Sequence, residues 1–165
     1  MNRSRPVLAG AVLGAVALAL AGCGDSAPVN PGPAPTTPPP ARAAVAMTIG
    51  GIVLACDNSE RIQPPFSCRV RSNIRFNESN GVASTVQSIR LDMFEPSGTF
   101  IERNQIEGAN LPGGSSIPAN GIRDYVELDL YFSARPTPGR YVLIIANLKD
   151  ATGFGSELQS GRLGF

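Results

Sequence analysis

After residue 45, apolar and polar residues alternate with a period of two, which predicts β-strands. Clusters of Gly, Pro, Asn and Ser separate the alternating segments, as turns do. Gly50 and Gly51 interrupt the first segment and suggest a bulge there. In the clearest segment, apolar Cys68, Val70, Ile74 and Phe76 oppose polar Arg69, Arg71, Asn73 and Arg75. The alternation predicts seven strands, at 48–56, 66–76, 87–94, 98–103, 123–132, 140–148 and 157–162.

Seven short strands in about 120 residues are typical of one all-β domain, a sandwich of two sheets around a single core. The run Pro138-Gly139-Arg140-Tyr141-Val142-Leu143-Ile144-Ile145 resembles the E–F turn and strand F of immunoglobulin-like and fibronectin-III-like domains. The resemblance implies an immunoglobulin-like β-sandwich with Tyr141 in the place of the corner tyrosine. It also implies an F–G hairpin at residues 150–153. This chain departs from antibody domains because its strand F has no cysteine and it contains no tryptophan.

The segment 140–148 is apolar on both faces. If Tyr141, Leu143 and Ile145 point into the core, the alternate residues Val142, Ile144 and Leu148 point outward. An apolar outer face needs a cover or a partner. Two explanations therefore stay open: the loop at 108–121 folds over this face, or Val142, Ile144 and Leu148 form a partner surface.

The first 22 residues have the pattern of an export signal. Arg3 and Arg5 precede an apolar stretch at 7–20, which is too short for a comfortable membrane span. Leu20-Ala21-Gly22-Cys23 resembles the lipobox of bacterial lipoproteins. The resemblance implies cleavage before Cys23, lipid on its thiol, a membrane partner through that lipid, and a place in the cell envelope on the periplasmic or extracellular side. Stable anchoring takes more than one acyl chain, which a diacylglycerol on Cys23 supplies.

Residues 24–45 are rich in proline and favour an extended spacer rather than a core. At about 3.1 Å per residue, such a tether reaches on the order of 60 Å. The predicted organisation is a signal peptide at 1–22, a lipidated cysteine with its disordered linker at 23–45, and the sandwich domain at 46–165.

Cysteine use follows from the export signal. Because Cys23 is assigned to lipid, Cys56 and Cys68 remain, and outside the cytoplasm they are expected to form a disulfide. The chain has no histidine, so a zinc site is not expected. No cofactor and no metal are predicted.

Candidate chemistry is sparse. Without histidine, Ser-His-Asp and Cys-His catalytic arrangements are excluded. In the segment 123–132, apolar Val126, Leu128, Leu130 and Phe132 are expected to face the core, opposite Tyr125, Glu127, Asp129 and Tyr131. Glu127 and Asp129 lie about 6.5–7 Å apart on their shared face, which could suit a general acid and base. Cross-strand ion pairs with the arginines of 66–76 are the simpler interpretation.

The charge balance also bears on function. Removal of the signal leaves 12 basic and 13 acidic residues, so no nucleic-acid partner is expected. We therefore expect a non-catalytic, lipid-anchored envelope domain that binds or scaffolds, with a protein in the envelope as its possible partner. The alternatives are a carbohydrate- or peptidoglycan-binding module, for which Tyr125 and Tyr131 are the candidate aromatic residues, and an envelope enzyme using Glu127 and Asp129.

Overall fold

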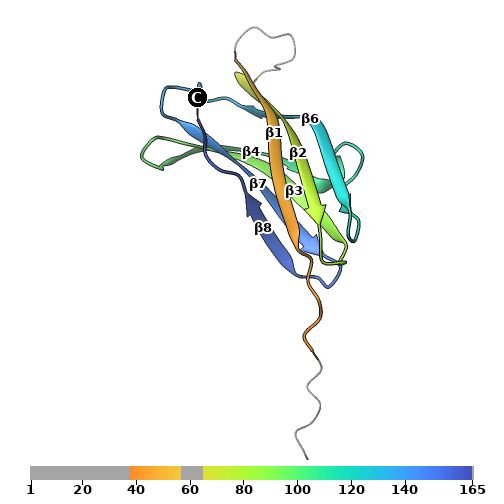
Figure 1. Ribbon diagram of the computed structural model, residues 1–165. Helices are drawn as coiled ribbons and strands as arrows, with labels where there is room; N and C mark the ends of the chain where they lie inside the picture. The colour runs from red at the N-terminus through yellow and green to blue at the C-terminus, as the bar shows by residue number, and fades with distance from the viewer. Residues whose placement is uncertain (1–37, 57–64, 165) are drawn as a thin grey trace, which may run out of the picture. The chain divides into compact units, whose positions relative to one another are not determined.

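The computed structural model describes residues 38–56 and 65–164, which belong to one compact unit. Within these residues the chain forms strands and one short 3-10 helix, η1 (Figure 1). The elements are β1 (Val45–Cys56), β2 (Cys68–Glu78), β3 (Ser84–Phe94), β4 (Phe100–Glu107), η1 (Gly108–Asn110), β5 (Ser116–Ile117), β6 (Ile122–Phe132), β7 (Tyr141–Asp150), β8 (Gly155–Gln159) and β9 (Leu163–Gly164).

The strands form two antiparallel sheets that face each other. Sheet A has the order β1-β2-β6, and sheet B has the order β4-β3-β7-β8, with β5 added to β3 and β9 added to β7. Strands β1, β2 and β6 thus form one layer, and β3, β4, β7 and β8 form the other. The prediction of a single all-β sandwich is confirmed.

All seven predicted segments contain a strand, but some bounds differ. The strand expected at 98–103 begins at Phe100 and continues to Glu107, because residues 95–99 form the preceding turn. The strand expected at 157–162 is β8, which ends at Gln159. Two strands were not predicted, β5 and β9, because two residues are too few to show a period.

The predicted signal peptide, Cys23 and most of the tether lie outside the described residues. Among the residues that the structure describes, no helix is long and apolar enough to cross a bilayer.

The core lies between the inner faces of the two sheets. Sheet A contributes the apolar set predicted for β2 together with alternate residues of β6, and sheet B contributes alternate residues of β3 and β7. Burial of this apolar surface is the main force that holds the two sheets together. The fully buried side chains include Val70, Ile74, Phe76, Tyr125, Leu130, Phe132, Ile89, Leu91, Met93 and Ile144.

Strand β7 has the opposite orientation to the one expected. Val142, Ile144 and Leu148 are 1%, 0% and 3% exposed and belong to the core. Val142 pairs with Met93 and Ile144 pairs with Leu91, and both partners on β3 are core residues. The predicted partner surface at Val142, Ile144 and Leu148 is therefore wrong, because these side chains are buried inside the sandwich.

The outward face of β7 is covered by side chains of neighbouring residues. Tyr141 stacks on Phe94 with ring centroids 5.3 Å apart, and the Arg162 guanidinium lies 4.5 Å from the Tyr141 ring centroid. Ile145 is only 3% exposed and pairs with Arg90 of β3. Long arginine side chains can cover apolar surface with their stems.

The loop expected to cover β7 lies elsewhere. Residues 108–121 pack against β3, where β5 adds a short strand. They also bind β6, because the Tyr125 hydroxyl donates to the Gly114 carbonyl at 2.9 Å and the Arg123 side chain donates to the carbonyls of Ser116 and Gly113. The loop therefore closes the β6 side of the sandwich.

Two bulges meet at Asn73 in the middle of β2. The pairing of β1 with β2 shifts between Gly50 and Val53, which confirms the bulge predicted at the two glycines. The pairing of β6 with β2 shifts across Val126 and Glu127. The Glu127 N–H donates to the Asn73 Oδ1 at 2.8 Å, and Glu127 has a left-handed φ of 53°.

The second bulge corrects the faces predicted for β6. An extra residue reverses the alternation, so Val126 is 70% exposed although it was expected in the core. For the same reason Tyr125 is 1% exposed, although it was expected on the outer face. Leu128, Leu130 and Phe132 follow the bulge and are buried as predicted.

Candidate functional site

The outer face of sheet A carries the carboxylates considered for catalysis, and arginines hold both of them. Arg71 donates from Nε and Nη2 to the two oxygens of Asp129 at 2.8 and 2.9 Å, and from Nη1 to the Glu127 Oε2 at 3.3 Å. The hydrogen bonds that Arg71 donates to Asp129 raise the pKa of Arg71. Arg69 approaches the same Asp129 at 3.6 Å. The predicted cross-strand ion pairs are confirmed.

Arg75 pairs with Asp124, a partner that was not predicted. Its guanidinium donates to both carboxylate oxygens of Asp124 at 2.7 and 2.9 Å. This hydrogen bonding lowers the pKa of Asp124. Among the described residues, no group of three or more His, Cys, Asp or Glu could hold a metal ion.

A shallow hollow of about 310 Å³ lies above the paired bulges. Gly50 has no side chain and Asn73 has a short one, which leaves room for the hollow where they line it. Arg75 and Asp124 line it as well. Tyr125 also lines the hollow, but its side chain is buried in the core. A sugar-binding surface usually presents an aromatic ring to the ligand, and this hollow lacks one in the described part of the chain.

Of the two tyrosines considered for sugar binding, Tyr131 lies on the outer face of sheet A. It is half-buried, and its ring lies 5.6 Å from that of Phe66 at an angle of 32°. Tyr125 is buried beneath the sheet, so the two tyrosines proposed for sugar binding lie on opposite faces.

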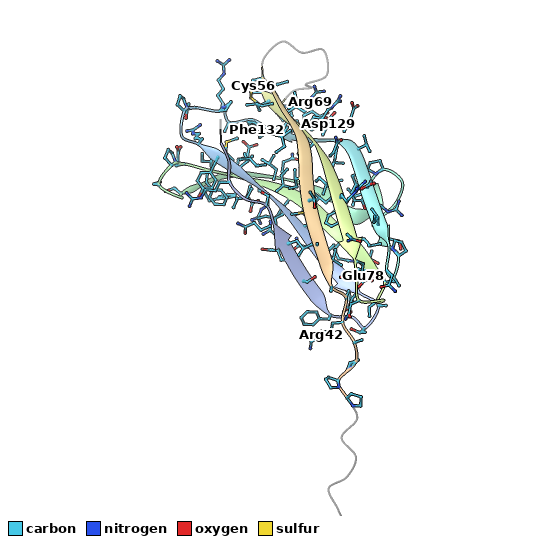
Figure 2. The ribbon with its side chains drawn as sticks, in the orientation of Figure 1. Arg42, Cys56, Arg69, Glu78, Asp129 and Phe132 are labelled. Atoms are coloured by element: carbon cyan, nitrogen blue, oxygen red, sulfur yellow. A yellow bond between two sulfur atoms is a disulfide. The ribbon has the colours of Figure 1, made fainter. Side chains whose placement is uncertain are left out.

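The end of the sandwich opposite the start of β1 holds the disulfide, and we call it the disulfide end. Cys56 and Cys68 are bonded, as predicted, and they tie the last residue of β1 to the first residue of β2. Cys68 also pairs with Phe132 at the end of β6. Figure 2 labels Cys56 and Phe132 at this end and Arg42 and Glu78 at the opposite end.

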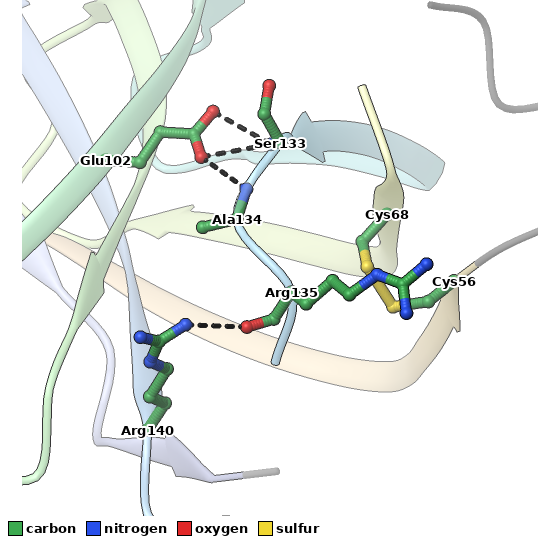
Figure 3. The surroundings of a disulfide bond; sticks show 7 residues. All are labelled: Cys56, Cys68, Glu102, Ser133, Ala134, Arg135 and Arg140. Atoms are coloured by element: carbon green, nitrogen blue, oxygen red, sulfur yellow. Dashed lines mark hydrogen bonds between the residues drawn. A yellow bond between two sulfur atoms is a disulfide. The ribbon is translucent and has the colours of Figure 1, made fainter. Parts of the chain in front are cut away.

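The loop between β6 and β7 is held tightly at the disulfide end. The Glu102 carboxylate accepts the backbone N–H of Ser133 at 2.9 and 3.0 Å and that of Ala134 at 2.8 Å (Figure 3). Glu102 belongs to β4 of sheet B, while Ser133 follows β6 of sheet A. The carboxylate therefore joins the two sheets.

Arg140 fastens the other end of the same loop. Its guanidinium donates to both oxygens of Glu95 at 2.6 and 3.1 Å and to the Arg135 carbonyl at 2.7 Å. The hydrogen bond from Arg140 lowers the pKa of Glu95. With both ends fixed, the loop is pre-organised, which lowers the entropic cost of binding a partner there.

At the other end of the sandwich, which we call the N-terminal end, Glu78 binds four backbone groups. Its carboxylate accepts N–H donors from Asn120 at 2.7 Å, Asn80 at 2.8 Å, Gly81 at 3.0 Å and Ala44 at 3.2 Å. Burial of the side chain raises the pKa of Glu78, but these backbone donors more than offset it and lower the pKa to about 2. Glu78 is therefore ionised and joins three separate segments.

The residues immediately before β1 are bound to the same end. The Ala43 N–H donates to the Asp150 carboxylate at 3.2 Å, and the Asn80 side chain donates to the Arg42 carbonyl at 2.6 Å. The Arg42 guanidinium lies 3.9 Å from the centroid of the Phe154 ring. We call residues 42–44 the strap, because these contacts fix them against the sandwich.

Sequence reasoning missed Glu78 and Asp150, although their positions carried a signal. Glu78 continues the even-numbered inward set of β2, and Asp150 ends the even-numbered inward set of β7. A carboxylate at a core-facing position must find hydrogen-bond donors, so both positions indicated a buried acceptor.

Comparisons with known proteins give no family. No protein-family model matches the chain, and no curated protein matches it. Among solved structures, a Bordetella pertussis structural genomics target named as an ApaA protein aligns with 76% of this chain and 94% of its own length, at 12% identity and a TM-score of 0.47. Structural genomics target SoR45 aligns with 74% of this chain and 83% of its own length, at 12% identity and a TM-score of 0.44.

Proposed function

We propose that the protein is a lipid-anchored, non-catalytic component of the cell envelope. In this proposal, lipid on Cys23 holds the chain at a membrane, a proline-rich stalk spaces it, and the sandwich binds or scaffolds an envelope partner. The observation that carries the proposal is the sequence Leu20-Ala21-Gly22-Cys23 behind a basic start and an apolar stretch.

The strap supports this arrangement. The stalk enters the sandwich at the N-terminal end, where residues 42–44 are fixed by Glu78, Asp150 and Asn80. A fixed attachment orients the domain on its stalk better than a free joint would. The disulfide end then points away from the attachment, and its pre-organised loop at 133–140 is available to a partner.

A binding role fits the outer face of sheet A better than catalysis does. Glu127 and Asp129 are both hydrogen-bonded to Arg71, so a neighbouring side chain of the same sheet already occupies their oxygens. Of the two tyrosines considered for the carbohydrate-binding alternative, Tyr131 lies on that face and Tyr125 is buried.

The experiment that tests the anchor is mass spectrometry of the protein from its native membrane. We expect an N-terminal Cys23 that carries acyl chains, and we expect Cys23→Ser to release the protein from the membrane fraction. A mature protein with an unmodified N-terminus at another residue contradicts the proposal.

A second experiment separates binding of proteins from binding of sugars. The protein is titrated with soluble peptidoglycan fragments, and the Tyr131→Ala variant serves as the matched control. We expect no saturable binding. Saturable binding that Tyr131→Ala abolishes supports the carbohydrate-binding alternative instead.

A further inference from the structure

The edge strands of the two sheets differ in charge. An exposed edge can pair with another chain, and proteins usually protect edges with charged residues, prolines or bulges. The edges formed by β4, β6 and β8 all carry charged residues, among them Glu102, Arg123 and Glu157. β1 is also an edge strand, and none of its twelve residues is charged.

The two halves of β1 are covered differently. Before the bulge, Met47 and Ile49 pack against the core and line a hollow together with Gln159 of β8. After the bulge, Ile52, Val53 and Leu54 are 43%, 52% and 37% exposed. These three consecutive residues are three of the seven exposed large apolar residues of the described chain.

The exposed half is still a regular strand on its paired side. Val53 pairs with Arg71, Leu54 pairs with Val70, and Ala55 follows in the same register. Its opposite side pairs with no strand among the described residues. Backbone N–H and C=O groups on that side are therefore oriented for a further strand.

We propose that the edge of β1 from Gly51 to Ala55 binds an extended, uncharged segment of a partner protein, which adds as a fourth strand to sheet A. Main-chain hydrogen bonds supply the affinity in this mode, and alternate side chains supply the specificity. The partner segment is expected to be apolar because Val53 and Leu54 point to opposite faces of the sheet and both are apolar. The inference deepens the proposed binding function and rests on it.

A second copy of the chain fits this edge less well. Two β1 strands that pair antiparallel around Val53 send their Val45 ends in opposite directions. Eight residues at about 3.3 Å each place these ends about 50 Å apart, at opposite ends of the pair. With both chains anchored to one membrane, one stalk would use most of its reach of about 60 Å to run back along the domains. A strand from a different protein meets no such constraint.

The test uses the full chain in detergent micelles and a capped decapeptide of alternating Thr and Val. The control peptide has Pro in place of the central Val, which prevents it from pairing as an inner strand. Amide hydrogen exchange is followed in β1 and β6. We expect the first peptide to slow exchange by about tenfold or more at residues 51–55 and the proline peptide to leave it unchanged.

Two variants with matched exposure identify the edge. Val53 on β1 and Ile122 on β6 are each 52% exposed, and they lie on opposite edges of the same sheet. A lysine at an edge position opposes strand addition. We expect Val53→Lys to weaken binding of the first peptide by about tenfold or more and Ile122→Lys to change it by less than about twofold.

Three outcomes overturn the inference. The first outcome is that no concentration of the Thr-Val peptide slows amide exchange at residues 51–55. If the unfolding midpoints show that the proteins are folded, this result means that the edge does not bind the peptide. An equal loss of binding in Val53→Lys and Ile122→Lys means that β1 is not the edge involved. Sedimentation that finds a dimer of the peptide-free chain, dissociated by Val53→Lys, assigns the edge to a second copy. Acylation of Cys23 does not enter this assay, so a failed edge and a failed anchor are distinguishable.

Discussion

Single carboxylates connect segments that the two sheets alone leave unconnected. Glu78 and Glu102 each accept two or more backbone N–H groups from another part of the chain. Such charge-assisted hydrogen bonds are stronger than those between neutral groups. They also satisfy N–H groups in loops, where no neighbouring strand supplies an acceptor. Each carboxylate therefore supplies hydrogen-bond acceptors to a loop, as a neighbouring strand does within a sheet.

Glu78 makes stability depend on pH. Its pKa in the folded protein is about 2, below the ordinary value of 4.5, so its contribution is fully present above about pH 4.5. The contribution is lost as the pH falls toward 2, because the unfolded chain takes up the proton first. We expect Glu78→Gln to lower the unfolding midpoint at pH 7 by several degrees, and the difference from the unaltered protein to shrink as the pH falls to about 2.

Thermal unfolding of both proteins between about pH 7 and pH 2 checks this prediction. Glu107→Gln is the control, because Glu107 is an exposed carboxylate on β4. It should leave the midpoint almost unchanged. A Glu78→Gln midpoint that stays below that of the unaltered protein by the same margin at every pH contradicts the assigned role.

At the scale of elements, β2 is the strand on which both irregularities of sheet A depend. Asn73 faces a bulge in β1 on one side and a bulge in β6 on the other. The glycine pair made the first bulge predictable, since glycine adopts the left-handed backbone that bulges require. The second bulge places a left-handed φ at Glu127, a residue type that gives no such signal. The faces of Tyr125 and Val126 could therefore not be read from alternation.

The two adjacent glycines of β1 should respond to alanine in opposite ways. Gly51 has a φ of +59°, and a Cβ there would lie 2.8 Å from the Asn73 Nδ2. Gly50 has no atom within 4 Å of an added Cβ. We expect Gly51→Ala to cost about 1–2 kcal/mol of unfolding free energy and Gly50→Ala to be neutral or to add up to about 1 kcal/mol. Urea unfolding measures both, and equal effects would argue against the bulge.

The reversed orientation of β7 shows where sequence patterns stop being informative. Both alternate sets of β7 are apolar, so periodicity alone does not choose the inward set. The inward orientation considered for Tyr141, Leu143 and Ile145 is wrong, because Val142, Ile144 and Leu148 are the residues in the core. The choice is made by the pairing with β3, whose Leu91 and Met93 are buried and bring Ile144 and Val142 inward beside them. A shift of one residue exchanges the two faces completely.

Truncation of Ile144 tests this orientation. Ile144 is 0% exposed in the core, so Ile144→Ala should lower the unfolding free energy by about 2–5 kcal/mol. Val126→Ala is the control, because Val126 is 70% exposed although both residues are apolar and lie in long strands. It should change stability by less than about 0.5 kcal/mol. Similar small effects in both variants would indicate that Ile144 lies on the surface and not in the core.

At the scale of the molecule, the sandwich could be predicted from the sequence. Turn residues separate the strands, and apolar and polar residues alternate between the two faces of β2. The contacts between the ends of the strands were harder to predict. The strap, the Glu78 site and the loop at 133–140 depend on which loops meet in space, and seven strand positions do not determine that order.

At this scale, the outer faces of the sheets and the edge of β1 differ in their charged residues. Charged residues on the outer faces of both sheets meet partners on neighbouring strands, as Arg71 meets Asp129 and Arg103 meets Asp92. Such faces offer little unbalanced charge to a ligand. The uncharged edge of β1 is the feature that differs, which is why the inference on partner binding rests on that strand.

The disulfide should stabilise the folded molecule without being required for its core. Cys56 and Cys68 are separated by 12 positions and close the connection between β1 and β2. In the chain-entropy account, a loop of this size contributes roughly 3 kcal/mol by restricting the unfolded chain. The core of two sheets does not depend on the bond, so the reduced domain should stay folded with a lower urea midpoint. The Cys56→Ala/Cys68→Ala variant, which places no hydroxyl at the buried position of Cys68, should have a midpoint close to that of the reduced protein and should not respond to a reductant. An unaltered protein with the same midpoint before and after reduction would show that the bond contributes nothing to stability.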